Sequence, residues 1–240
     1  MIIKFKNTAI VMLCLLSLAS CNTKNEDNFV LNGYVKDLKK GTLYLQKEGK
    51  RSLITLDSVV VNGDPNFTLS TEIKEPVLLY LRLYKKDGNE HYIPFFASEG
   101  ITTVNTTLKT FANAEIKGSK QQEVFGEYLK LMSNFKDKNL ELIKANFEAV
   151  QRKDTLAADS IVKRSDRLLK LKYASTINFA LNHKDSEIAP YLALYEIPDA
   201  NVKFLDSIYN NLTSEVKTSL YGKRLGNALD EFKKVKDSLK

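Results

Sequence analysis

Cysteine, histidine and tryptophan are the scarce residue types in this chain of 240 residues, which has two, two and none of them. Neither His91 nor His183 has a second histidine or a carboxylate at the spacing of a zinc site. Glycine-rich phosphate-binding motifs and the Gly-x-Ser-x-Gly motif of serine hydrolases do not occur either. We therefore expect no catalytic residue, no metal and no cofactor, and we expect both histidines to be surface or partly buried residues.

The N-terminal segment has the pattern of a signal peptide. Lys4 and Lys6 precede the apolar run Thr8–Leu18, which is too short for a membrane-spanning helix. The run leads into Leu-Ala-Ser followed by Cys21, which resembles the lipobox of bacterial lipoproteins. The resemblance implies cleavage before Cys21 and acyl chains on this residue that hold the protein in a membrane. The alternative is a core helix that contains a cysteine by chance.

This interpretation predicts both a location and an excluded chemistry. The mature protein is expected in the bacterial cell envelope, lipid-anchored at the outer membrane, with the membrane face left open. Cys14 would leave with the signal peptide and Cys21 would carry lipid, so no free thiol would remain. Thiol–disulfide exchange and cysteine metal sites are then excluded, because both need a thiolate.

The net charge of +7 comes mostly from scattered lysines. Such a distribution is typical of a solvated surface, and attraction to anionic lipid headgroups is the alternative. Nucleic acid is not expected as a partner, because a protein of the envelope has no access to it inside the cell.

The N-terminal half alternates short strand-like segments with turn residues. The predicted strands are Phe29–Lys36, Gly41–Gln46, Ser52–Val61, Asn66–Ile73, Val77–Tyr84, Glu90–Ala97, Ile101–Thr106 and Ala114–Lys117. Strands of this length and spacing favour an antiparallel β-sandwich or barrel. Pro94 indicates that its strand lies at an edge or carries a bulge.

The pattern becomes helical after Gly118. Ser119 and Gln122 form a potential capping box at the start of the first helix. Apolar residues at helical spacing follow at Val124, Phe125, Tyr128, Leu131, Met132 and Phe135, and continue at Leu140, Ile143, Phe147 and Val150. Further helices are predicted over Ala157–Leu181, Glu187–Glu196, Asn201–Leu212 and Thr218–Leu239.

The predicted fold class is α+β, with an N-terminal antiparallel β-sandwich-like domain followed by a C-terminal helical region that packs on it. The segments are a signal peptide over 1–20, a polar tether over 21–28, the β domain over 29–118 and the helical region over 119–240.

Short motifs in the β domain carry a family resemblance. They are Leu31–Tyr34, Gly41–Leu45, Leu56–Val59, Asn66–Leu69, Glu99–Ile101 and Ile116–Ser119. In this order they resemble a domain of unknown function in Bacteroidetes envelope lipoproteins, which usually precedes a thioredoxin-like domain with a Trp-Cys-x-x-Cys motif. The resemblance covers about Phe29–Lys236. The thioredoxin-like motif has no counterpart here, so the redox activity that the resemblance implies for longer relatives has no residues in this chain.

One strand is a candidate for ligand binding. In Val77–Tyr84 the side chains of Tyr80, Arg82 and Tyr84 point to the same face, because side chains alternate along a strand. Two tyrosines and an arginine suit a sugar, peptide or protein partner, since they combine apolar area with polar ends. The alternative is that this face packs under the helical region.

A recurring Asp-Ser/Thr-apolar pattern resembles the O-glycosylation acceptor of Bacteroidetes envelope proteins. In the helical region it places candidate acceptors at Thr155, Ser160, Ser207 and Ser238. The alternative is that these residues start helices and turns.

Together these features predict a membrane-anchored, non-catalytic binding or adaptor protein with an unknown protein, peptide or glycan ligand. A competing hypothesis is an accessory subunit of a thiol–disulfide or peroxide-handling system whose redox domain is on another chain. Two further hypotheses are an enzyme of an unrecognised class and a truncated relative of a redox lipoprotein.

Overall fold

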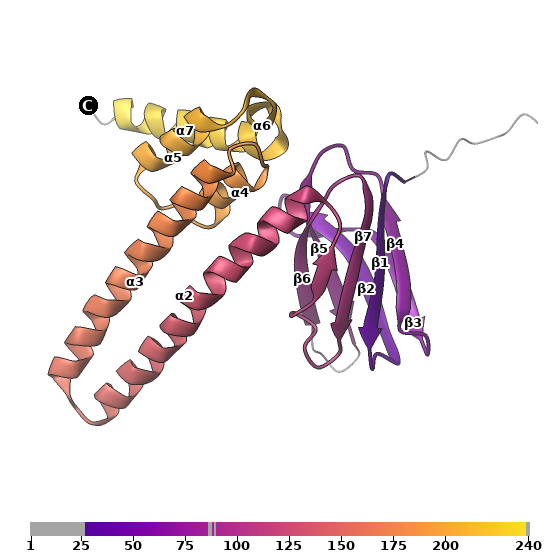
Figure 1. Cartoon of the computed structure of the whole chain (residues 1–240), viewed down its shortest axis with the longest axis horizontal. Helices are drawn as coiled ribbons and strands as arrows, with labels where there is room; N and C mark the ends of the chain where they lie inside the picture. Colours follow the sequence, from indigo (N-terminus) through magenta and orange to yellow (C-terminus); the bar gives the residue numbers. More distant parts are fainter. Residues whose placement is uncertain (1–26, 86–87, 89, 239–240) are drawn as a thin grey trace, which may run out of the picture.

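The computed structural model describes residues 27–85, 88 and 90–238, with side chains up to residue 234. Two four-stranded sheets from the N-terminal half face each other, and helices make up the rest (Figure 1). The predicted α+β class with a sandwich-like N-terminal domain is confirmed. The predicted signal peptide, Cys21 and most of the predicted tether lie outside the described residues.

The strands agree closely with the sequence pattern. They are β1 (Phe29–Lys36), β2 (Lys40–Glu48), β3 (Leu53–Asn62), β4 (Asn66–Thr71), β5 (Val77–Tyr84), β6 (Glu90–Ala97), β7 (Gly100–Thr107) and β8 (Glu115–Lys117). One sheet has the order β4-β1-β7-β8 and the other β3-β2-β5-β6. The pairs are antiparallel except for β1 and β7, which run parallel. Pro94 lies on β6, at the edge of its sheet, as predicted.

Local side-chain hydrogen bonds hold the strand ends of the sandwich. Asn28, the last residue of the predicted tether, donates from Nδ2 to the carbonyl of Ile73 at 2.7 Å and accepts from its amide at 2.8 Å. Asp57 accepts from the amides of Ser58 at 2.7 Å and Ser70 at 2.8 Å, so it connects β3 to β4. The tether therefore joins the sandwich at Asn28 rather than after it.

The sandwich core forms between the two sheets from alternating side chains. On β5, Leu79, Leu81 and Leu83 are fully buried and point into it. Gly33 is required by close packing in this core, because a Cβ there would lie 2.1 Å from the ring of Phe67. The motifs Leu31–Tyr34 and Asn66–Leu69, which contain Gly33 and Phe67, thus have a packing role.

The helices form a long hairpin and a compact cluster (Figure 1). They are α2 (Lys120–Gln151), α3 (Thr155–Asn182), α4 (Ile188–Tyr195), α5 (Val202–Asn211), α6 (Ser214–Thr218) and α7 (Leu220–Ser238). The α2–α3 hairpin projects away from the sandwich, and α4 to α7 gather at the C-terminal end of α3. Of the helices in the described part of the chain, none combines the length and apolarity of a membrane span.

A second core, here called the junction core, joins the two halves. Leu78 of β5 and Phe96 of β6 are cross-strand neighbours, and both point away from the sandwich interior toward the helices. Phe96 is fully buried, with its ring 5.2 Å from Phe125 of α2 and 5.1 Å from Tyr191 of α4. The full membership is Leu78, Phe96, Val124, Phe125, Tyr128, Ile188, Tyr191, Leu192 and Tyr221. The helical region therefore packs on the β domain, as predicted.

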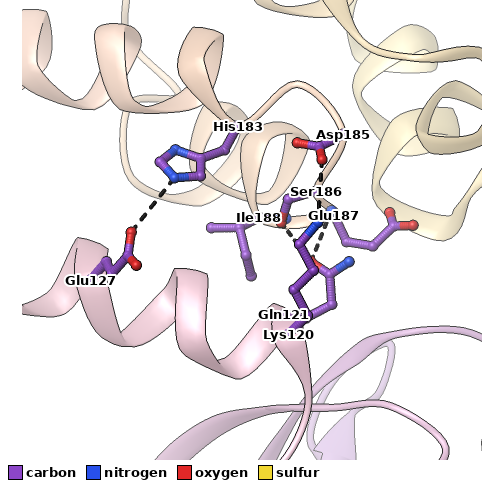
Figure 2. Close-up of polar contacts among 8 residues, drawn as sticks. All are labelled: Lys120, Gln121, Glu127, His183, Asp185, Ser186, Glu187 and Ile188. Carbon is purple, nitrogen blue, oxygen red and sulfur yellow. Dashed lines mark hydrogen bonds and ion pairs between the residues drawn. The ribbon is translucent and has the colours of Figure 1, made fainter.

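The first turn of α2 is hydrogen-bonded to both halves. Ser119 caps the helix by accepting from the amide of Gln122 at 3.2 Å. The predicted capping box is only half formed, because the Gln122 side chain instead accepts from the amide of Phe96 at 2.8 Å. Gln121 accepts from the Ser186 hydroxyl at 2.5 Å and from the amide of Glu187 at 3.2 Å (Figure 2). Adjacent glutamines thus hold the sheet edge and the α3–α4 turn.

The apolar face predicted for α2 is buried in the first half of the helix only. Val124, Phe125 and Tyr128 are buried in the junction core. Farther along, Leu140, Ile143, Phe147 and Val150 are 54%, 57%, 62% and 61% exposed. We call these four residues the hairpin stripe.

Replacing Phe96 by alanine should lower the free energy of unfolding by roughly 3–5 kcal/mol, because it empties the centre of the junction core. The matched change Phe204→Ala, at a ring that is 51% exposed on α5, should cost less than half as much. Urea unfolding followed by circular dichroism measures both. Equal losses in the two variants would contradict a shared core around Phe96.

Candidate ligand-binding site

A pocket of about 390 Å³ lies where β5, the end of β2 and the β4–β5 loop meet α4 and α7. Its lining includes four tyrosines, which are Tyr80, Tyr191, Tyr195 and Tyr221. Both halves of the chain contribute walls, so the pocket depends on the junction core beside it. Its volume is in the range of sites for small ligands.

The pocket tyrosines of the helical region lie on α4 and α7. Tyr191 and Tyr195 are four residues apart on α4, so they share a face, and their rings stack with centroids 5.0 Å apart. Tyr221 of α7 meets Tyr191 edge-on at 5.5 Å. The result is a contiguous aromatic wall with hydroxyl groups at its edges.

Three polar groups form one end of the pocket. Arg224 of α7 donates from Nη1 to the Tyr195 hydroxyl at 2.7 Å and to the Glu48 carboxylate at 3.1 Å. The Tyr195 hydroxyl donates to the same carboxylate oxygen at 3.0 Å. Arg224 and Glu48 keep side-chain exposures of 41% and 52%, so both can also bind a ligand. We call Glu48, Tyr195 and Arg224 the polar triad.

Burial keeps the pocket hydroxyls protonated. It raises the pKa of Tyr191 and of Tyr221 far above the ordinary value for tyrosine. Burial also raises the pKa of Tyr80, and the charge of Glu48 adds to this. Burial likewise raises the pKa of Tyr195, although Arg224 opposes the shift. These phenols are therefore neutral hydrogen-bonding groups at neutral pH.

Two of these hydroxyls are available for a ligand. The Tyr221 hydroxyl accepts from the amide of Leu78 at 3.0 Å, which fixes α7 against β5. Within the described part of the chain, the hydroxyls of Tyr80 and Tyr191 make no hydrogen bond. A ligand can place an apolar face against the aromatic wall. Its polar groups can then form hydrogen bonds with the free hydroxyls and with the polar triad. Over the residues that the structure describes, no cluster of side chains suited to a metal ion is found.

The predicted ligand face on β5 is divided by the helices. Tyr80 lies in the pocket and packs against the junction core, as the alternative interpretation expected. Arg82 remains outside, with its guanidinium 5.3 Å from the Tyr44 ring and 5.7 Å from the Tyr84 ring. It also pairs with Glu90. Tyr84 is 38% exposed, and together with Arg82 it forms a surface that is separate from the pocket.

The candidate glycosylation residues lie in different surroundings. Thr155 and Ser160 are exposed on α3, whereas Ser207 is half-buried on α5. The side chain of Ser238 lies outside the described ones. Asp154 caps α3 by accepting from the amide of Ala157 at 3.0 Å, so the helix-start interpretation holds at this position. Modification of these residues stays a prediction.

The histidines are surface or partly buried, as the sequence indicated. His91 is exposed, with its ring 6.1 Å from that of Phe111. His183 stacks on Phe179 at 4.1 Å, and its Nε2 lies 3.6 Å from the Glu127 carboxylate of α2 (Figure 2). The sequence did not indicate this contact, because Glu127 and His183 lie far apart in the chain.

The polar triad was not anticipated from the sequence. The spacing of Tyr191 with Tyr195, and of Tyr221 with Arg224, is visible as shared helix faces. Nothing in the sequence indicates that these two faces meet Glu48 at the end of β2. The signal that could have found part of the wall is the pair Tyr191 and Tyr195, four residues apart on one short helical segment.

A comparison with known families supports the β domain and the first turns of α2. Residues 29–125 match the model of a family described as a domain of unknown function (DUF4369). The predicted domain of unknown function is thereby confirmed over residues 29–125, and its occurrence in envelope lipoproteins next to a thioredoxin-like domain stays a prediction. The matched range includes Phe96, Gln121 and Gln122, and it excludes α4 and α7. No curated protein matches the chain.

Replacing Glu187 by glutamine should change how stability depends on pH. Burial raises the pKa of the Glu187 carboxyl, and the charges of Glu75 and Glu215 raise it further, while a hydrogen bond from Ser219 partly offsets the shift. Folding therefore favours the protonated form. The resulting stabilisation is complete below the ordinary glutamate pKa and is lost as the pH rises through the raised folded-state value.

The free energy of unfolding of the wild type, relative to the Glu187→Gln variant, should therefore decrease as the pH rises above about 4. Urea unfolding of both proteins across the pH range measures this difference. A difference that stays constant with pH, or increases, would contradict a raised pKa of the Glu187 carboxyl in the folded protein.

Proposed function

We propose that this protein is a lipid-anchored envelope protein that acts as a non-catalytic binding module, with the tyrosine-lined pocket as its ligand site. The observation that carries the proposal is the combination, in one pocket, of an aromatic wall, two free hydroxyls and the polar triad. Apolar walls with a few converging polar groups are characteristic of ligand sites.

The pocket favours a ligand with a flat apolar face and hydroxyl or amide groups at its edge. A sugar unit has these properties, since its C–H face can lie on Tyr195 while its hydroxyls reach Arg224 and Glu48. A short peptide is the other ligand class that fits. The pocket volume of about 390 Å³ suits one or two such units, so a longer ligand would extend beyond the polar triad.

Membrane anchoring through Cys21 is the second part of the proposal. It is supported by the order of lysines, apolar run and lipobox-like sequence at the N-terminus. In the structure, the chain enters the sandwich at Asn28, which is fixed to Ile73. A tether of a few residues from Cys21 to Asn28 would hold the β domain close to the membrane surface.

An accessory role in a thiol–disulfide or peroxide-handling system is the second candidate function. It is supported by the strand motifs, which resemble those of domains that precede a thioredoxin-like domain. Co-purification of a thioredoxin-like protein from native membranes would favour this role over ligand binding.

Binding of oligosaccharides and short peptides to the purified protein should be lost in pocket variants. A panel of both classes identifies the ligand, and isothermal titration then compares variants. Tyr195→Ala and Arg224→Ala should each weaken binding at least about tenfold, because they remove the wall or the polar triad. The control is Tyr34→Ala on β1, in the sheet that does not contain β5. Tyr34 is 39% exposed and Tyr195 is 40% exposed, and the control should leave binding unchanged. Loss of binding in Tyr84→Ala, with Tyr195→Ala unaffected, would assign the ligand to the other end of β5.

Replacing Cys21 by serine should release the protein from membranes. Without the thiol no acyl chain can be attached, so the variant should leave the detergent phase in a detergent-partitioning assay of cells. Cys14→Ser, within the same N-terminal segment, is the matched control and should remain membrane-bound. Retention of the Cys21→Ser variant in the detergent phase would contradict lipid anchoring at this residue.

A further inference from the structure

The α2–α3 hairpin is closely packed at both ends but not between them. Toward the junction, Tyr128 is buried and its ring centroid lies 5.4 Å from that of Phe179 on α3. Toward the tip, Leu142 of α2 and Ile161 of α3 are buried in one cluster. In α2, which the structure describes in full, no residue between Tyr128 and Leu142 is buried. The same holds for the fully described α3 between Ile161 and Thr176.

A groove of about 600 Å³ occupies this open part of the hairpin. Its apolar lining comes from both helices and consists of Leu129, Met132, Phe135, Leu168 and Leu169. A second groove, of about 730 Å³, lies between α3 and the start of α5. Leu169 lines both, so the two form one path along α3, which we call the hairpin groove.

The end of the hairpin groove nearer the tip is polar and positively charged. Its polar residues there are Lys136, Asn139 and Ser165. Within the part of the chain that the structure describes, Lys136 forms no ion pair. Closer to the junction, Nζ of Lys172 lies 3.5 Å from the Glu196 carboxylate, so these two charges compensate each other. Lys136 therefore supplies an uncompensated positive charge at this end.

The opposite end of the hairpin groove is apolar and has no net charge. Its apolar lining includes Tyr173, Ile177 and Phe204. The two charged residues of this lining, Lys170 and Asp199, have opposite signs. The groove is thus amphiphilic along its length, with a cation at one end and apolar side chains at the other.

This polarity and the length of the groove select a fatty acid as the occupant. From Ser165 to Ile177, α3 rises about 18 Å. Half of a bilayer's hydrocarbon core, the length of one leaflet's acyl chains, is about 15 Å. A sugar would make little use of the apolar lining. An extended peptide would bury backbone amides against side chains that cannot form hydrogen bonds with them.

We infer that the hairpin groove binds one fatty acid molecule, with the carboxylate beside Lys136 and the acyl chain running past Leu169 toward Phe204. An ion pair with Lys136 holds the head group, and the apolar side chains remove the acyl chain from water. The hairpin groove shares no lining residue with the tyrosine-lined pocket, so the inference does not rest on the function proposed for that pocket.

Photolabelling of the full chain in its native membranes tests the site. The probe is palmitic acid with a diazirine on its acyl chain, and mass spectrometry locates the labelled peptides. Labelling should be saturable, so that an excess of unmodified palmitic acid prevents it. The labelled positions should fall within residues 129–139, 165–177 and 199–204.

A change at Leu169 should block the path of the acyl chain. Leu169→Gln should lower labelling at least about fivefold, because it places an amide where the two parts of the groove meet. Leu171→Gln is the matched control, since Leu171 is 54% exposed and Leu169 is 53% exposed on the same helix. Leu171 lines neither part of the groove, so the control should label like the unchanged chain. Circular dichroism checks that both variants fold.

A change at Lys136 tests the position of the carboxylate. Lys136→Gln should lower labelling by the acid at least about threefold. It should leave labelling by the corresponding fatty alcohol, which carries no charge, unchanged. Lys163→Gln, at an exposed position of α3 outside the groove, should affect neither probe.

Four results would overturn the inference. Absence of saturable labelling would show that the groove takes no fatty acid. Labelling confined to the hairpin stripe would show that the probe reaches the exposed face of α2 from the bilayer instead. Equal losses in Leu169→Gln and Leu171→Gln would show that labelling does not depend on the groove. Equal losses of acid and alcohol labelling in Lys136→Gln would remove the proposed place of the carboxylate.

Discussion

The burial of Phe96 between a sheet and three helices is the interaction on which the rest of this structure depends. Phe95 and Phe96 are adjacent on β6, and the alternation of a strand sends their rings to opposite faces. Phe95 fills the sandwich core, whereas Phe96 fills the junction core. A two-residue aromatic pair therefore joins two otherwise separate hydrophobic cores. The pocket walls from β5, α4 and α7 meet because this second core brings them together.

Hydrogen bonds at the same place make the contact specific. An edge strand has unpaired amides that are costly to bury, and Gln122 satisfies the amide of Phe96 from the first turn of α2. The neighbouring Gln121 holds the turn between α3 and α4. The family match extends to residue 125, so it includes this docking turn with the β domain. The helices α4 and α7, which complete the pocket, lie beyond the matched range.

The fold could be predicted from sequence to a large extent, because its determinants are local. Strand alternation located all the described strands to within about two residues, and Pro94 indicated an edge. The parallel pairing of β1 with β7 was not predictable, since it depends on which distant strands become neighbours. For the same reason the sequence showed Tyr80 as a candidate and missed its companions. Tyr195, Arg224 and Glu48 are far apart in the chain, and only tertiary packing places them at one end of a pocket.

Helical periodicity predicted an apolar face along all of α2, but it could not tell which part of that face the chain itself covers. The proximal residues pack in the junction core, and the hairpin stripe remains exposed. The chain therefore has a pocket at the junction of its two halves and an exposed apolar stripe on the distal half of α2.

Amide hydrogen exchange at Phe96 tests the docking of the two halves most directly. On the free edge of β6, the amides of Phe96 and Tyr92 have the same orientation, because they are four residues apart. Only the Phe96 amide has a partner from the helical region, in Gln122. The Phe96 amide should exchange as slowly as the amides of the buried strand β5, and the Tyr92 amide should exchange much faster. Equally fast exchange at Phe96 and Tyr92 would show that α2 does not stay docked on the sheet edge, and it would contradict the shared core and the pocket that depends on it.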